Sequence, residues 1–181
     1  ADQVAREIRH NDADARAEIQ RRFGTYEAAE LADVVFTDPD AQIVMPTVAE
    51  DVAFSLRRSG LSGPERDGLV HDTLRRFDLQ DHADHPAHLL SGGQKQLLAL
   101  ASVLVTGPAI LVCDEPTTLL DARNARRIAR LVDGLPQQVL MVTHNLELVE
   151  RFDRVVVLDG GRVVADDAPT AALRTYRSLV D

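Results

Sequence analysis

Two adjacent carboxylates follow an apolar run in the sequence. Asp114 and Glu115 come directly after residues 109–113, which read AILVC, a pattern typical of a strand buried on both faces. At such a position Asp114 can bind Mg²⁺ together with substrate phosphate oxygens. Glu115 can orient or deprotonate an attacking water molecule. The alternative interpretation is an acidic loop in which Asp121 caps the next helix.

A histidine and a glycine-rich turn are further candidates. His144 follows the apolar residues 139–142, where a neutral imidazole can hydrogen-bond a γ-phosphate or position the water; a structural histidine is the alternative. The turn consists of Ser91, Gly92, Gly93 and Gln94. Its glycines let backbone amides approach an anion, and the helix that begins there directs the positive end of its dipole to the same place. The alternative is a plain helix capped by serine.

The stretch HADHPAH contains another group of potential ligands. His82, His85 and His88 recur every three residues, and histidine clusters raise the question of a metal site. Pro86 disrupts a regular helical face, so the stretch is typical of a loop. We therefore expect a solvated connector here, with a metal site as the alternative.

Hydrophobic periodicity indicates which elements position these residues. Strands are expected at residues 34–36, 109–113, 139–142 and 155–158. The apolar run at 139–142, like that at 109–113, predicts a strand buried on both faces. Helices are expected at residues 1–32, 47–58, 64–77, 91–106, 122–132, 146–152 and 169–180. The apolar stripe of the helix over residues 64–77 is expected to comprise Leu69, Val70, Leu74 and Phe77. The alternation of strands and helices predicts an α/β fold with a largely parallel sheet. Because ligands bind beyond the carboxyl ends of such strands, Asp114, Glu115 and His144 should converge there.

Local signals refine two of these elements. Thr47 and Glu50 have the spacing of a capping box at the start of the helix over residues 47–58. The residues Asp-Gly-Gly at 159–161, followed by a short apolar run, predict a hairpin.

Composition and charge exclude several classes of protein. The 181 residues suffice for one domain with a core, and 29 acidic against 20 basic residues, a net charge of −9, argue against a nucleic-acid partner. The single cysteine, Cys113, excludes an internal disulfide and fits a reducing cytosol, and its apolar surroundings indicate a core residue. No apolar run approaches the ~20 residues of a membrane helix, and the first residues do not read as a signal peptide. We expect a cytosolic domain that contacts a membrane only through a partner.

Four segments, taken in order, resemble the motifs of the ATP-binding subunits of ABC transporters. LSGGQKQLLALA (90–101) is similar to their signature loop and helix, and ILVCDEP (110–116) resembles Walker B with its catalytic glutamate. TTLLD (117–121) resembles the D-loop, and VTHNLEL (142–148) resembles the switch-histidine segment. The resemblance covers roughly residues 33–168. It implies a P-loop NTPase-like fold with a helical subdomain.

The resemblance also implies roles for the candidate residues. Asp114 would help to bind Mg²⁺, Glu115 would be the general base, and His144 would sense the γ-phosphate of ATP. The signature turn, residues 91–94, would close over an ATP molecule held by the opposite subunit of a dimer. Asp121 would couple the two ATP sites.

The segment VVFTDPDAQIVMPTVAEDVAFSL (34–56) narrows the resemblance further. It is similar to the Q-loop region of energy-coupling factor (ECF) ATPases, which drive the uptake of vitamins and of cobalt or nickel ions. The segments LSGGQKQLLALASVL and DEPTTLLDARNARRI look closest to the biotin-uptake ATPase of that group. Thr37 would occupy the position of the Q-loop glutamine, and Gln42 would belong to the transporter contact. Residues 38–88 would form the Q-loop and helical subdomain that contacts a transmembrane coupling protein, and residues 89–181 would carry the remaining motifs.

One motif of the family does not occur in this sequence. None of the 10 glycines precedes a Lys-Ser or Lys-Thr pair in a GxxxxGK[ST] loop, the Walker A motif, and the only lysine, Lys95, follows the signature. That loop supplies most of the grip on the β- and γ-phosphates. Residues 1–32 are expected to form an atypical, helical N-terminal segment that replaces or precedes the part of the family's domain that carries this loop. We therefore expect weak nucleotide binding by the chain alone, and competence chiefly as the signature-bearing half of a composite ATP site.

Two functions follow from this pattern. The first is an ATP-hydrolysing subunit of an ECF-type ABC importer of a vitamin, with biotin as one candidate, or a metal ion, with ATP and Mg²⁺ as cofactors. Its partners would be a second ABC ATPase subunit and a transmembrane coupling protein, and it would be a cytoplasmic protein on the inner face of the cell membrane. The alternative is a truncated, non-catalytic partner that contributes only the LSGGQ half-site or binds the coupling protein.

Overall fold

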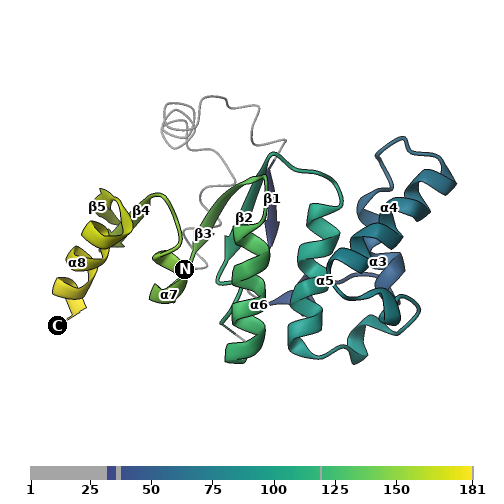
Figure 1. Cartoon of the computed structure of the whole chain (residues 1–181), viewed down its shortest axis with the longest axis horizontal. Coiled ribbons are helices and arrows are strands. Elements are labelled where there is room, and N and C mark those ends of the chain that lie inside the picture. The colour runs from purple at the N-terminus through teal and green to yellow at the C-terminus, as the bar shows by residue number, and fades with distance from the viewer. Residues whose placement is uncertain (1–31, 36–37, 119, 181) are drawn as a thin grey trace.

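The central element of the fold is a three-stranded parallel sheet (Figure 1). The computed structural model describes residues 32–35, 38–118 and 120–180, so Thr37 and almost all of the expected helix over residues 1–32 lie outside the described residues. The strands β1 (Ala32–Val35), β2 (Ile110–Asp114) and β3 (Gln138–Val142) lie in the order β1-β2-β3. Parallel strands need crossover connections, which the intervening helices supply. The predicted α/β fold with a parallel sheet is confirmed.

The two strands that carry the candidate carboxylates and histidine differ in burial. Leu111 and Cys113 of β2 are fully buried, while their neighbours along the strand are half-buried. β3 alternates between half-buried and exposed residues, and Leu140 and Val142 are 48% and 52% exposed. The expectation that residues 139–142 are buried on both faces is therefore wrong. β3 lies at one edge of the described sheet, and the face that carries Leu140 and Val142 is left open there.

Helix α5 (Gly92–Leu104) forms the centre of the hydrophobic core. Its residues from Gln96 to Leu104 are all buried, and it packs against β1 on one side and α3 (Val48–Ser55) on the other. Figure 1 shows α5 standing between the sheet and the helices α3 and α4. A short connection leads from the C-terminus of α5 into the start of β2, so the helix and the strand run in opposite directions. The N-terminus of α5 therefore lies at the end of the sheet where β2 ends.

The helical part beside α5 begins as the sequence predicts. Thr47 caps α3 and exchanges hydrogen bonds with Glu50 in a capping box. α4 (Gly63–Arg76) follows, with Pro64 in its first turn, and packs on α3. Leu69 was expected on the apolar stripe of α4 but is 38% exposed, whereas Val70 and Leu74 are buried. Short 3₁₀ turns complete this part: η2 (Pro39–Ala41), η3 (Gln80–His82) and η4 (Ala87–Leu89).

The remaining elements follow the sheet. α6 (Ala122–Asp133) connects β2 to β3, and α7 (Leu146–Val149) follows β3. β4 (Val155–Asp159) and β5 (Arg162–Asp167) form an antiparallel two-stranded sheet, and α8 (Pro169–Val180) packs on it. Gly160 and Gly161 have φ angles of 53° and 75°, which a tight hairpin turn requires and glycine adopts without strain. The predicted hairpin is confirmed.

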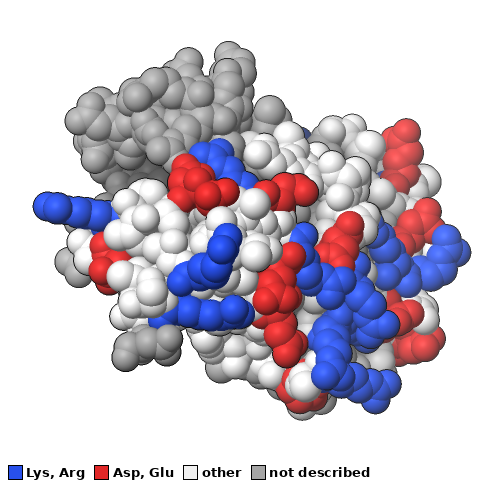
Figure 2. Space-filling view, turned by 60° about the vertical axis from the view of Figure 1, so that its left-hand side comes forward, with Lys and Arg blue, Asp and Glu red and all other residues white. Residues whose placement is uncertain are grey.

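Charged side chains of both signs are interspersed over the face that carries α6 and the hairpin (Figure 2). Arg154, directly before β4, forms a bidentate ion pair with Asp166 of β5, and Arg151 pairs with Asp133. The described helices do not include one that combines the length and apolarity needed to cross a bilayer.

Candidate functional site

Glu115 occupies a strained position directly after β2. Its φ angle is 50°, in the left-handed region, which costs a residue with a Cβ about 1–2 kcal/mol. Its backbone N–H donates to the carbonyl of Val142 at 2.8 Å, which continues the pairing of β2 with β3 by one residue. This turn directs the Glu115 side chain toward the end of β3. The expected convergence of Glu115 and His144 is thereby confirmed.

Four donors contact the Glu115 carboxylate. The backbone N–H and the ring Nδ1 of His144 lie 3.0 and 2.7 Å from Oε1. The hydroxyl groups of Thr118 and Thr143 donate to Oε2 at 2.9 and 3.2 Å. A carboxylate offers about four lone-pair positions, so these donors engage its full accepting capacity. Before Glu115 can accept a proton from water, it must release at least one of them.

The same contacts set the charge of Glu115. Partial burial alone would raise the pKa of Glu115. This effect is outweighed by the hydrogen bonds from His144, Thr118 and Thr143 and by the charge of His144. The pKa of Glu115 is therefore lowered, and the group is ionised at neutral pH. An ionised carboxylate only accepts hydrogen bonds, so Nδ1 of His144 carries a proton. The ring is 69% exposed, which leaves Nε2 accessible to a ligand.

Asp114 is the last residue of β2 and lies next to Val142 in the sheet. It is half-buried and precedes Glu115, whose own oxygens are already engaged. The described residues contain no group of three or more histidine, cysteine, aspartate or glutamate side chains that could hold a metal ion by themselves. One carboxylate at a strand end nevertheless fits Mg²⁺, because this ion usually takes one or two carboxylates and completes its shell with phosphate oxygens and water.

The signature turn is built as a capping box. The hydroxyl of Ser91 accepts from the backbone N–H of Gln94 at 3.4 Å, and the side chain of Gln94 accepts from the N–H of Ser91 at 2.9 Å. Gly92 and Gly93 open α5, and the first N–H groups of a helix have no intrahelical acceptor. The geometry therefore presents backbone donors at the positive end of a long helix, as an anion-binding turn requires.

Two contacts hold this turn from the outside. The amide nitrogen of Gln94 lies 3.0 Å from Nε2 of His82, and Lys95 pairs with Asp40 of η2 at 2.6 Å. His82 also makes an edge-to-face contact with His85. His82 thus belongs to the support of the signature turn, which the regular spacing of histidines in the sequence does not reveal.

Asp121 caps α6 through the N–H of Asn124 at 2.9 Å and also accepts from the amide nitrogen of Asn124 at 3.0 Å. The pKa of Asp121 is lowered, chiefly by the backbone hydrogen bond from Asn124. The alternative in which Asp121 caps a helix and the D-loop interpretation are therefore compatible. Cys113 is buried, and burial raises its pKa to about 12, as for an unreactive core thiol.

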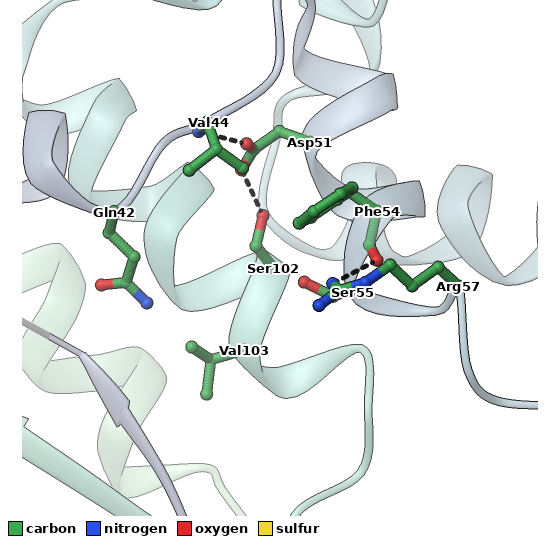
Figure 3. A pocket seen from close by; sticks show the side chains of 8 residues that line it. All are labelled: Gln42, Val44, Asp51, Phe54, Ser55, Arg57, Ser102 and Val103. Carbon is green, nitrogen blue, oxygen red and sulfur yellow. Dashed lines mark hydrogen bonds between the residues drawn. The ribbon is translucent and has the colours of Figure 1, made fainter.

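A groove of about 190 Å³ lies where η2, α3 and α5 meet (Figure 3). Gln42, Phe54 and Arg57 are among its lining residues. The buried carboxylate of Asp51 accepts from the N–H groups of Val44 and Met45 and from the hydroxyl of Ser102. Asp51 therefore fixes the segment after Gln42 to both helices.

The structure gathers the candidate residues into two groups. Asp114, Glu115 and His144 meet at the ends of β2 and β3, whereas the signature turn and Asp121 meet where α5 and α6 begin. Thr118, Thr143, Asn124 and His82 complete these groups but were not predicted. Thr143 and Thr118 adjoin predicted motifs, which is a usable signal; Asn124 and His82 are found only through tertiary contacts.

The parallel sheet, with acidic groups and a histidine at its strand ends and an anion-binding helix start beside them, has the architecture of a P-loop NTPase-type ATPase. A family model described as "AAA domain, putative AbiEii toxin, Type IV TA system" matches residues 4–150. An ABC transporter ATP-binding protein of Deinococcus radiodurans is 50% identical over 143 residues, which are 79% of this chain and 63% of that protein.

Further relatives carry more specific names. The biotin transport ATP-binding protein BioM of Rhizobium etli is 45% identical over 80% of this chain and 65% of its own length. The energy-coupling factor transporter ATP-binding protein EcfA1 of Caldanaerobacter subterraneus is 37% identical over 85% of this chain and 57% of its own.

Among solved structures, CbiO1 from Clostridium perfringens, described as part of the ABC transporter complex CbiONQ, superposes with a TM-score of 0.74 at 32% identity. The match covers 83% of this chain and 62% of CbiO1. The chain belongs to the ATP-binding proteins of ABC transporters. It spans less than two thirds of the length of these relatives.

Proposed function

We propose that the chain is an ATP-hydrolysing subunit of an ECF-type ABC importer that takes up a vitamin or a metal ion. The single observation that carries this proposal is the engagement of Glu115 by His144 at the end of the sheet, beside Asp114. The relatives named for biotin transport and for energy coupling support the ECF type, and biotin is one candidate solute.

In this proposal ATP binds between two ABC ATPase subunits. The N–H groups at Gly92 and Gly93 and the hydroxyl of Ser91 contact the γ-phosphate of a nucleotide held by the second subunit. Gln94 keeps the turn in shape through its capping bond to Ser91. Asp121 lies in the adjacent D-loop and contacts the same subunit boundary.

The proposed catalytic group of this chain consists of Asp114, Glu115 and His144. It acts on a nucleotide bound at the ends of β2 and β3. Asp114 would hold Mg²⁺, and the bound ion would supply positive charge that stabilises the phosphate oxygens. When Nε2 of His144 also carries a proton, it would donate a hydrogen bond to the γ-phosphate, and this contact would loosen the hold of His144 on the carboxylate. Glu115 then orients a water molecule for in-line attack and accepts its proton.

The groove beside Gln42 is the proposed docking site of a transmembrane coupling protein. It lies between the Q-loop segment and α5, so an occupant contacts the helix whose start is the signature turn. In keeping with this partner, we place the protein in the cytoplasm at the inner face of the membrane. Residues 38–88 act as the Q-loop and helical subdomain, and residues 89–181 carry the motifs that contact the nucleotide. Of the two proposed Q-loop residues, Gln42 lines the groove, and Thr37 lies outside the described residues.

A second candidate function has an observation of its own. The signature turn is complete and capped, and such a turn acts on a nucleotide that the other subunit holds. The chain would then be a non-catalytic partner that supplies only the LSGGQ half-site or binds the coupling protein.

The two functions are separated by ATPase measurements on the chain assembled with an ABC ATPase subunit that carries GxxxxGK[ST]. If Glu115→Gln lowers the rate of the assembly, the catalytic group of this chain is active. If only Ser91→Arg lowers the rate, the chain contributes the half-site alone. An unchanged rate in both variants contradicts both roles at an ATP site and leaves only binding to the coupling protein, which co-purification with that protein then tests.

A further inference from the structure

Gly93 of the signature turn has no room for a side chain. A Cβ atom at this position would lie 2.5 Å from Cγ, 2.6 Å from Nδ2 and 2.8 Å from Oδ1 of Asn124. All three distances are shorter than real Cβ contacts, so the amide group of Asn124 covers Gly93 directly. Gly93 does not belong to the glycines with positive φ, so its backbone conformation does not require glycine. A side chain at this position would instead require the amide group of Asn124 to move.

The neighbouring glycine provides an internal comparison. A Cβ atom at Gly92 would meet nothing within 4 Å. Both glycines lie in the first turn of α5, and both would present N–H groups to an anion. The requirement for glycine that arises from Asn124 therefore applies to Gly93 alone.

The amide of Asn124 cannot turn away without breaking a hydrogen bond. Its Nδ2 donates to one carboxylate oxygen of Asp121 at 3.0 Å, while its backbone N–H donates to the other at 2.9 Å. One turn later Arg127 donates to the carbonyl of Phe77 at 3.0 Å and pairs with Asp78 at 2.6 Å. These contacts hold α6 against the part of the chain that leads to the signature turn.

We propose that Asn124 is a positioning residue that joins the signature turn to Asp121 at a fixed separation. This inference rests on the proposed function, in which the signature turn and Asp121 face the same partner subunit. The amide of Asn124 lies on Gly93 and is hydrogen-bonded to Asp121. A displacement of the signature turn therefore displaces Asp121 through Asn124, and a displacement of Asp121 likewise displaces the turn. It does not touch the nucleotide itself.

A double-mutant cycle on the chain tests the contact without requiring ATPase activity. Gly93→Ala should lower the Tm by about 4 °C or more, because the new methyl group displaces the amide from Asp121. In an Asn124→Ala background the same substitution should lower the Tm by less than about 1 °C, because the methyl group then has space. The matched control Gly92→Ala should leave the Tm unchanged. Equal losses from Gly93→Ala in both backgrounds would overturn the proposal.

Kinetics of the assembled ATPase test the positioning role. Asn124→Ala should lower kcat about tenfold and leave KM for ATP within about twofold, because positioning affects the closed arrangement more than nucleotide capture. Gly93→Ala should be slower than the double variant Gly93→Ala/Asn124→Ala. A double variant no faster than Gly93→Ala would show that Gly93 serves phosphate approach alone. If no assembly hydrolyses ATP, the proposed function fails while the thermal cycle still decides whether the contact exists.

An isosteric variant separates hydrogen bonding from packing. Asn124→Asp keeps the shape of the side chain but places a second carboxylate 3.0 Å from Asp121. Its Tm relative to the wild type should fall at neutral pH and recover as the pH is lowered and one of the two carboxylates becomes protonated. A Tm difference that does not vary with pH would contradict the bond between Asn124 and Asp121.

Discussion

At the scale of single residues, Glu115 combines a strained backbone with a saturated side chain. Its left-handed φ is held by the bond to Val142, and its carboxylate by His144, Thr118 and Thr143. A general base in this state is charged but has no lone pair to spare. In the proposed mechanism this is a resting arrangement, and catalysis would begin when His144 exchanges the carboxylate for another hydrogen-bond acceptor.

Replacement of Glu115 by glutamine should abolish hydrolysis without unfolding the chain. Glutamine has the same shape but cannot accept a proton, and loss of a general base typically costs 10²- to 10⁴-fold. The steady-state ATPase rate of the assembled protein measures the effect. Glu147→Gln, a change of an exposed carboxylate on α7, is the control and should leave the rate unchanged. An active Glu115→Gln variant would assign the base to another residue.

The lowered pKa of Glu115 also predicts a pH dependence of stability. The pKa of Glu115 is lower in the folded chain than in the unfolded chain, where it is about 4.3. The ionised carboxylate therefore stabilises the fold at pH values above this unfolded pKa. This stabilisation is lost as the pH falls through the folded pKa. The difference in unfolding free energy between wild type and Glu115→Gln should be constant near neutrality and shrink below about pH 4. Urea unfolding at a series of pH values measures it. A difference that grows toward low pH would have the wrong sign.

At the scale of elements, the N-terminal caps of the helices fix the conformation of the turns that precede them. Local spacing predicted the capping box of Thr47 and Glu50 and the serine cap of α5, because a cap depends on residues three apart. The same spacing could not show that Asn124 covers Gly93 or that His82 holds Gln94. Each of these contacts joins two segments that are distant along the chain. The segments come together only because the helices that carry them pack against the rest of the fold.

The cap of α5 should be separable from the function of its turn. Ser91→Ala and Thr47→Ala each remove a hydroxyl that accepts from an N–H at 3.4 Å, so each should destabilise the chain by about 1 kcal/mol. Only Ser91→Ala should also lower the ATPase rate of the assembly, because Ser91 lies in the proposed nucleotide contact. Chemical unfolding and ATPase assays provide the two measurements. Equal loss of ATPase activity in both variants would reduce the role of Ser91 to capping.

At the scale of the whole molecule, α5 links the signature turn, the hydrophobic core and the groove. Its start is the signature turn, its middle fills the core between the sheet and α3, and Ser102 near its end bonds to Asp51 in the groove. The parallel sheet and the order of its flanking helices could be predicted from periodicity. The open face of β3 could not, because an apolar run reads the same whether one face of the strand is covered or both.

The groove offers a test at this scale. Phe54 lines the groove and is 37% exposed, and Leu69 on α4 is 38% exposed but does not line it. Phe54→Glu should therefore weaken assembly with the transmembrane coupling protein at least tenfold, whereas Leu69→Glu should not. Co-purification and a titrated binding assay compare the two variants, and thermal unfolding confirms that both are folded. Equal weakening by both would argue against the groove as the docking site.

The open face of β3 also governs how the chain behaves at high concentration. Leu140 and Val142 place two apolar side chains on the same face of an edge strand of the described sheet, an arrangement that favours pairing between chains. Light scattering of the purified chain should therefore rise with concentration at neutral pH, and Leu140→Lys should suppress the rise without lowering the Tm. A rise of the same size in the Leu140→Lys variant would assign self-association to another surface. Colloidal stability, more than thermal stability, is then the property that this strand limits.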